Sequence, residues 1–260
     1  MIMKTANVNG ITLAFEDSGG SGPVVILSHG FLMDHSMFDA QVAALKNAYR
    51  VITWDERGFG GTRAETDFTY WDSANDVLAL MDHLKIESAV VGGMSQGGFL
   101  SLRVALTAPE RVKALILLDT QAGTEDPATI EPYNQLHAAW VEHGAVAVQD
   151  IIAGIILGPG EWNEWFAKWG AMKPDQFTKA FNCLMHRDDV TSRMGEITCP
   201  ALIVHGTADV AIGMEKAEVL RDSITGPTTL VAIEGGPHAA NMTHVEPVNA
   251  AILQFLGSLA

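Results

Sequence analysis

Ser95 is the residue whose surroundings most clearly suggest chemistry. It lies at the centre of Gly93–Gly97 (GMSQG), between an apolar run at 89–92 and a helical pattern at 96–108. A tight strand-to-helix turn needs small residues beside the serine and places its hydroxyl at a helix N-terminus, where backbone dipoles favour a developing oxyanion. The alternative is a glycine-rich turn with an incidental N-cap serine. Because a strand and a helix are expected on its two sides, the pattern favours Ser95 as a nucleophile.

A serine hydroxyl needs a positioned imidazole to take its proton and an acid to orient that imidazole. Among nine histidines, His238 lies between the last strand-like run and the final helical pattern, and Asp209 follows the strand-like run at 200–205. Parallel strands end at one sheet edge, so both side chains are expected near Ser95. Asp119, which ends an earlier strand-like run, is the alternative acid. For His238 and Asp209 the alternative role is to cap or begin a helix.

The elements that must position these residues alternate along the first half of the chain. Short, continuous apolar runs lie at 24–28 (VVILS), 51–54 (VITW), 89–92 (AVVG) and 114–118 (ALILL). Such runs are typical of strands buried on both faces of a parallel sheet. Helical patterns at 36–46, 71–84 and 96–108 separate them, which predicts βαβ crossovers. At the N-terminus, Asn9-Gly10 between two β-type runs predicts a hairpin at the sheet edge.

The character changes between residues 120 and 195, where the periodicity is helical and Trp, Phe and Met are frequent. Strand-like runs return at 200–205 and 229–234. This order predicts an α/β fold with a mostly parallel, doubly wound sheet flanked by helices and an inserted helical cap. The predicted core is 1–119 and 196–260, and the predicted cap is 120–195. Four aromatic residues of the cap are expected to line a substrate pocket above the serine: Trp140, Trp162, Trp165 and Phe166. The alternative is that they pack only against other helices.

Five short motifs occur in a fixed order along nearly the whole chain. They are His29-Gly30, Asp55–Gly60 (DERGFG), Gly93–Gly97 (GMSQG), His205–Asp209 (HGTAD) and Gly235–His238 (GGPH). Each is weakly specific, but the ordered set resembles the α/β-hydrolase superfamily, which uses a nucleophile, acid and histidine in that order. Pro237 stands where the family often has glycine. The resemblance favours Asp209 over Asp119 as the acid. It also implies an oxyanion hole from the backbone N–H groups of Phe31 and Gln96.

Composition narrows the function classes. The 260 residues include 16 Lys and Arg against 31 Asp and Glu, a formal charge of −15. This charge disfavours nucleic-acid and membrane-surface partners. The longest apolar run is far shorter than the roughly 18 residues of a membrane span. Cys183 and Cys199 are expected to be free thiols in a reducing cytoplasm. No spacing suggests a metal or a cofactor site, and a homo-oligomer stays open.

A serine in the GMSQG turn argues against haloalkane dehalogenase and epoxide hydrolase chemistry, which in the resembled family use aspartate there. Ester or lactone hydrolysis, C–C bond hydrolysis and cofactor-free haloperoxidase or perhydrolase activity remain. Residues 33–45 and 94–111 are similar to enol-lactonases and small-ester carboxylesterases. The resemblance therefore favours a serine hydrolase that cleaves a small carboxylic ester or lactone through an acyl-enzyme. A ligand receptor with slow or absent hydrolysis is the alternative from another class.

Overall fold

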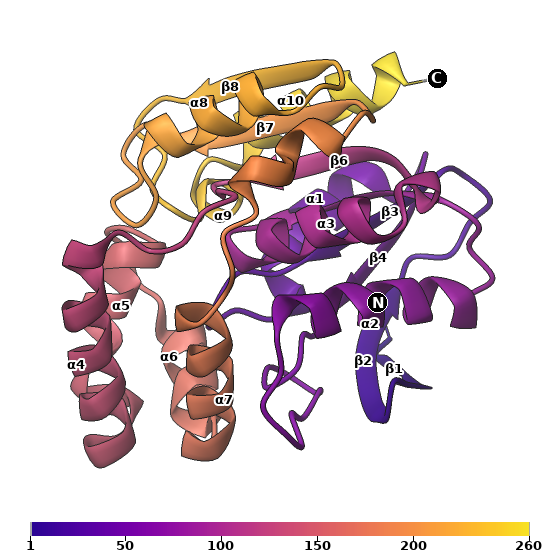
Figure 1. Ribbon diagram of the computed structural model, residues 1–260. Helices are drawn as coiled ribbons and strands as arrows, with labels where there is room; N and C mark the ends of the chain where they lie inside the picture. Colours follow the sequence, from indigo (N-terminus) through magenta and orange to yellow (C-terminus); the bar gives the residue numbers. More distant parts are fainter. Residues whose placement is uncertain (1, 260) are drawn as a thin grey trace.

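The computed structural model describes residues 2–259. Its centre is an eight-stranded sheet in the order β1-β2-β4-β3-β5-β6-β7-β8 (Figure 1). The strands are β1 (Lys4–Val8), β2 (Ile11–Asp17), β3 (Val24–Ser28), β4 (Arg50–Trp54), β5 (Ala89–Met94), β6 (Val112–Leu118), β7 (Ala201–Gly206) and β8 (Thr228–Ile233). Strand β2 is antiparallel to β1 and β4, and every other pairing is parallel.

Helices flank both faces of the sheet, which explains why its central strands are continuous apolar runs. On one face α1 (Asp39–Leu45) packs against α10 (Val245–Ser258), and on the other α2 (Tyr70–His83) packs against α3 (Gln96–Thr107). The remaining core helices are α8 (Met214–Ser223) and the short α9 (Ala240–Thr243). All residues of β5 and β7 are buried. The predicted fold class is therefore confirmed.

The predicted N-terminal hairpin is also confirmed. Val8 pairs with Ile11 across the turn, and Asn9 and Gly10 both have positive φ, 45° and 76°. Two consecutive residues in that region match the right-handed twist of paired strands. The expected helix at 36–46 begins differently, with a 3₁₀ turn, η1 (His35–Phe38), before α1. The Asp34 carboxylate accepts from the Ser36 N–H at 2.9 Å and fixes that turn.

Four helices lie between β6 and β7 in the chain and stand together beside the sheet in Figure 1. They are α4 (Pro127–His143), α5 (Gln149–Ile156), α6 (Asn163–Ala171) and α7 (Pro174–Met185). We call α4–α7 the helical insertion. Its helical character agrees with the sequence pattern, while the exact domain boundaries at 119/120 and 195/196 stay a prediction. Within residues 2–259, no helix combines the length and the apolar character needed to cross a bilayer. Cys183 and Cys199 are free thiols, as predicted.

Candidate active site

Ser95 occupies a sharp turn between β5 and α3. Its φ and ψ are 53° and −114°, a conformation that costs energy for any residue with a side chain. A Cβ at either Gly93 or Gly97 would overlap the Ser28 carbonyl oxygen on β3, so both neighbours must be glycine. The Ser95 N–H donates to the Leu118 carbonyl at 2.9 Å, which ties the turn to the end of β6. The local sequence therefore builds the strained strand-to-helix turn that the motif predicts.

His238 and Asp209 lie in two loops at the same sheet edge and contact each other. The distance between His238 Nδ1 and Asp209 Oδ2 is 2.7 Å. The other Asp209 oxygen accepts from the N–H groups of Ala211 and Ile212 at 2.8 and 2.9 Å. Burial alone would raise the pKa of Asp209, but His238 and the Ile212 N–H lower it below its ordinary value. An ionised carboxylate at Nδ1 places the imidazole proton there and leaves Nε2 as an acceptor.

Asp119, the alternative acid, has a different set of contacts. It directly follows β6 with a φ of 46°, and its Oδ1 accepts from the Gly206 N–H at 2.7 Å. Burial, with the adjacent charge of Asp209, raises its pKa well above the ordinary value. Asp119 thus holds the end of β7 through its contact with the Gly206 N–H. The structure brings Asp209, rather than Asp119, into contact with His238.

The two residues expected to form an oxyanion hole flank the serine. Gln96 opens α3, and the first N–H groups of a helix have no partner inside it. Phe31 follows His29-Gly30 after β3 and lines the same cavity as Ser95. The His29 side chain is buried and accepts from the Glu56 N–H at 2.9 Å, which fixes this loop. The part that the two backbone groups play in catalysis stays a prediction.

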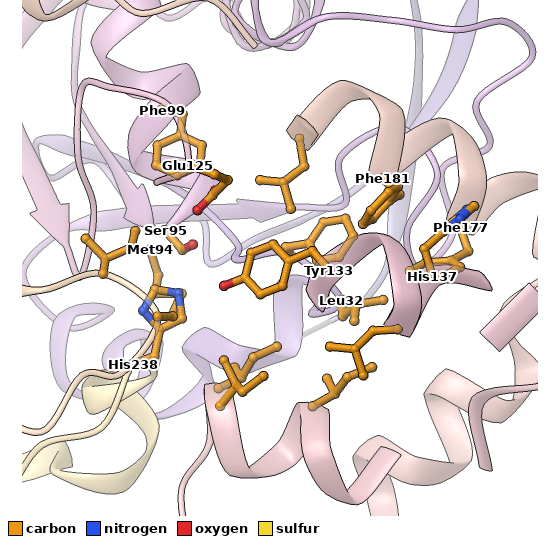
Figure 2. A pocket seen from close by; sticks show the side chains of 18 residues that line it. Leu32, Met94, Ser95, Phe99, Glu125, Tyr133, His137, Phe177, Phe181 and His238 are labelled. Atoms are coloured by element: carbon orange, nitrogen blue, oxygen red, sulfur yellow. The ribbon is translucent and has the colours of Figure 1, made fainter. Parts of the chain in front are cut away.

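Ser95 and His238 open onto a cavity of about 90 Å³ between the sheet edge and the helical insertion (Figure 2). Its walls are mainly apolar. From the insertion they include Tyr133, Leu136, His137, Ile152, Ile155, Ile156, Phe177, Phe181 and Leu184, and from the core Phe31, Leu32, Met94, Phe99, Ala211 and Ile212. Glu125, just before α4, completes the lining. An apolar pocket with a few polar groups beside a nucleophile is typical of a small-molecule site.

The four aromatic residues predicted to line this pocket do not line it. They are Trp140, Trp162, Trp165 and Phe166. Trp140 is buried and stacks on Phe177, with ring centroids 4.3 Å apart. Trp165 is buried under Lys168, whose ammonium lies 4.3 Å from the ring centroid. Large aromatic rings gain from burial against other side chains, which places Trp140 and Trp165 in the interior, while Trp162 and Phe166 are half-buried.

The wall residues that sequence reasoning missed follow a helical spacing. On α4 they are Tyr133, Leu136 and His137; on α5, Ile152, Ile155 and Ile156; on α7, Phe177, Phe181 and Leu184. Each set recurs at three- and four-residue steps, which places it on one helix face. That spacing was the available signal. The spacing predicts an apolar helix face, but it does not predict whether that face packs against another helix or lines a cavity.

Two clusters combine carboxylates and histidine within reach of a shared cation: Asp34–His35–Asp55 and Asp119–His205–Asp209. In the first, Asp55 accepts from His35 Nδ1 at 2.7 Å and from the Gly61 N–H at 2.8 Å. In the second, Asp209 is held by His238 as described above. Histidine and backbone N–H groups thus contact Asp55 and Asp209, and the Gly206 N–H donates to Asp119 Oδ1, so these carboxylates support the surrounding loops.

Comparisons with known proteins agree with this architecture. A family profile described as alpha/beta hydrolase fold matches residues 23–145. A Synechocystis sp. protein provisionally named a non-heme chloroperoxidase is 28% identical over 95% of each chain. Among solved structures, an esterase from Thermogutta terrifontis superposes with a TM-score of 0.89 at 26% identity, covering 100% of this chain and 99% of its own. The enol-lactonase from Burkholderia xenovorans LB400 gives 0.89 and 26%, covering 98% and 100%.

Proposed function

The chain belongs to the α/β-hydrolase superfamily, and from that premise we propose that it is a serine hydrolase acting on a small carboxylic ester or lactone. The observation that carries the proposal is the arrangement of Ser95 and the Asp209–His238 pair around one apolar cavity. The esterase and the enol-lactonase are similar along nearly their whole length, which supports the same class of reaction.

In the proposed reaction, His238 Nε2 takes the Ser95 proton while the serine oxygen attacks the substrate carbonyl carbon. Asp209 stabilises the imidazolium that forms. The N–H groups of Phe31 and Gln96 bind the oxyanion. The C–O bond to the leaving group then breaks, and His238 returns the proton to the departing alcohol. Water, activated by the same imidazole, hydrolyses the acyl-enzyme and restores Ser95.

Perhydrolase or haloperoxidase activity is the second candidate, favoured by the name of the Synechocystis relative. It uses the same acyl-enzyme, with hydrogen peroxide in place of water as the attacking species and a peracid as the product. A C–C bond hydrolase and a ligand receptor complete the alternatives. The ratio of peracid formed to ester hydrolysed separates the first two activities, and an absence of turnover points to a receptor.

The direct test is a panel of short p-nitrophenyl esters and lactones, together with a fluorophosphonate that labels activated serines. We expect turnover of at least one class and covalent labelling at Ser95, located by peptide mass spectrometry. Ser101, which is buried in α3 and donates to the Gly97 carbonyl at 2.6 Å, serves as an internal control and should stay unlabelled. A protein that neither turns over a substrate nor is labelled at Ser95 contradicts the proposal.

A further inference from the structure

One wall of the cavity beside Ser95 carries a carboxylate, although the rest is mainly apolar. Glu125 lies in the segment between β6 and α4, with a side chain 10% exposed. Its Oε1 accepts from Arg187 Nη1 at 2.8 Å. Figure 2 shows the Glu125 carboxylate turned toward the cavity that Ser95 and His238 line. A charge in so apolar a wall needs either a structural or a selective explanation.

The partner of this carboxylate is held away from the cavity. The Arg187 side chain is 1% exposed and also donates to the Leu184 and Gly123 carbonyls, at 2.9 and 3.1 Å. Its guanidinium carbon lies 4.3 Å from the centroid of the Phe99 ring. Arg187 does not line the cavity, and neither Lys nor Arg occurs among the lining residues found in 2–259. The ion pair thus presents its negative end to the substrate and keeps its positive end inside the protein.

Tyr133, on α4, is a second polar residue of the cavity wall that carries no positive charge. Burial, with the nearby charges of Glu125 and Asp209, raises the pKa of this phenol to about 12. Its hydroxyl therefore remains neutral at physiological pH and, in Figure 2, points toward the space beside Ser95 and His238. Among the lining residues found in 2–259, Glu125 is thus the only carboxylate, and the other polar side chains are those of Ser95, Tyr133, His137 and His238.

We propose that Glu125 is a specificity-determining residue that rejects substrates carrying a carboxylate and restricts this site to uncharged esters or lactones. The inference rests on the proposed function. A substrate carboxylate entering the cavity would lose its hydration and face Glu125 across a low-dielectric space, where like charges repel strongly. An uncharged acyl or alcohol group of the same size pays neither cost. Glu125, which is not one of the catalytic residues, thus selects uncharged substrates by repelling anionic ones.

The test uses pairs of esters that differ by a terminal carboxylate in place of a methyl group or a hydrogen. On the acyl side these are p-nitrophenyl hexanoate and the p-nitrophenyl monoester of adipic acid. On the alcohol side they are phenyl butyrate and 4-carboxyphenyl butyrate. The ratio of kcat/KM for the neutral ester to that for the anionic ester is measured for wild type, Glu125→Gln and Glu142→Gln. Glu142, near the C-terminal end of α4, is the control because its side chain is 75% exposed and does not line the cavity.

The wild type should prefer the neutral member of a pair by at least about tenfold. Glu125→Gln should lower that ratio by about tenfold or reverse it, because the Arg187 charge then lacks its carboxylate partner. Glu142→Gln should leave the ratio unchanged. If Glu125→Gln folds poorly, the double variant Glu125→Gln/Arg187→Met removes both charges and should also reduce the preference. Equal ratios in wild type and both Glu125 variants overturn the inference, while loss of all turnover in the wild type overturns the proposed function instead.

Discussion

At the scale of single residues, two buried aspartates at neighbouring strand ends have opposite properties. Asp209 faces His238, and the pKa of its carboxyl falls below the ordinary value. Asp119 has only backbone donors to offset its burial, and its pKa rises well above the ordinary value. Sequence order alone left both as candidate acids, because each follows a strand of the same sheet. The partner of each carboxyl decides between them, and that is a property of the folded chain.

Asp209→Asn should lower kcat by about 10³–10⁴-fold, because an amide at Nδ1 leaves the imidazole in the wrong tautomer. Asp119→Asn should lower kcat by less than about tenfold, since the amide oxygen can still accept from the Gly206 N–H and burial already favours the uncharged form of this side chain. Steady-state kinetics of both variants on one ester decide the assignment. The reverse order of the two losses would transfer the role of acid to Asp119.

Ser95→Ala should lower kcat by about 10⁴-fold or more, because the variant has no nucleophile to form an acyl-enzyme. The fold should persist, since the backbone bonds to Leu118 and from Gly98 do not involve the hydroxyl. Residual activity is measured with purified variant, and circular dichroism checks the fold. Near-wild-type turnover would exclude Ser95 as the nucleophile.

At the scale of secondary structure, the sheet and the serine turn were predictable and the pocket wall was not. Continuous apolar runs identify buried parallel strands, and the glycines of GMSQG are dictated by a backbone clash with Ser28. The wall depends on how four helices pack. Leu136 and Trp140 lie one helical turn apart on α4, yet the first lines the cavity and the second stacks on Phe177. The periodicity of the sequence predicts that Leu136 and Trp140 share one apolar face of α4. Only the tertiary structure determines what each of them packs against.

Ile155 on α5 should control the length of the group that the pocket accepts. Ile155→Ala enlarges the cavity and should move the optimum of kcat/KM toward longer acyl or alcohol chains, whereas Ile155→Phe should move it toward shorter ones. Each shift should change the ratio between a short and a long ester by about tenfold. Ile151→Ala on the same helix is the control, because Ile151 is 55% exposed. If the dependence of kcat/KM on chain length is the same in wild type and in all variants, Ile155 does not control substrate length.

At the scale of the whole molecule, one buried acid links the stability of the fold to pH. Glu56 lies in the DERGFG turn, 1% exposed, beside the ion pair in which Arg57 Nη2 donates to Asp76 Oδ1 at 2.8 Å. Burial raises the pKa of Glu56 to about 8 from an ordinary 4.5. The folded chain therefore keeps a proton that the unfolded chain gives up over this range. The turn motif thus holds a neutral acid in the core.

The free energy of unfolding should fall as the pH rises from 4.5 to about 8, because over that window only the unfolded state loses the Glu56 proton. The contribution is fully present below 4.5 and absent above about 8. Glu56→Gln should be more stable than wild type by a few kcal/mol at about pH 9 and little different at about pH 4.5. Urea denaturation at the two pH values measures this. Glu65→Gln, at a side chain 70% exposed, is the control, and a pH-independent difference would contradict the prediction.

Ala239, the residue after His238, connects the loop of the proposed catalytic histidine to the helical insertion. The Ala239 N–H donates to the carbonyl of Ile156 at 2.7 Å, where α5 ends and its last carbonyls have no partner within the helix. The loop of the imidazole is thereby fastened to the helical insertion. The Ala239 amide can exchange its hydrogen with deuterated water only when this hydrogen bond opens. Its exchange rate therefore reports how often the helical insertion separates from the loop of His238. A bound inhibitor should slow that exchange. The exchange rate of the Ala239 amide hydrogen then reports the opening rate that substrate entry and product release require.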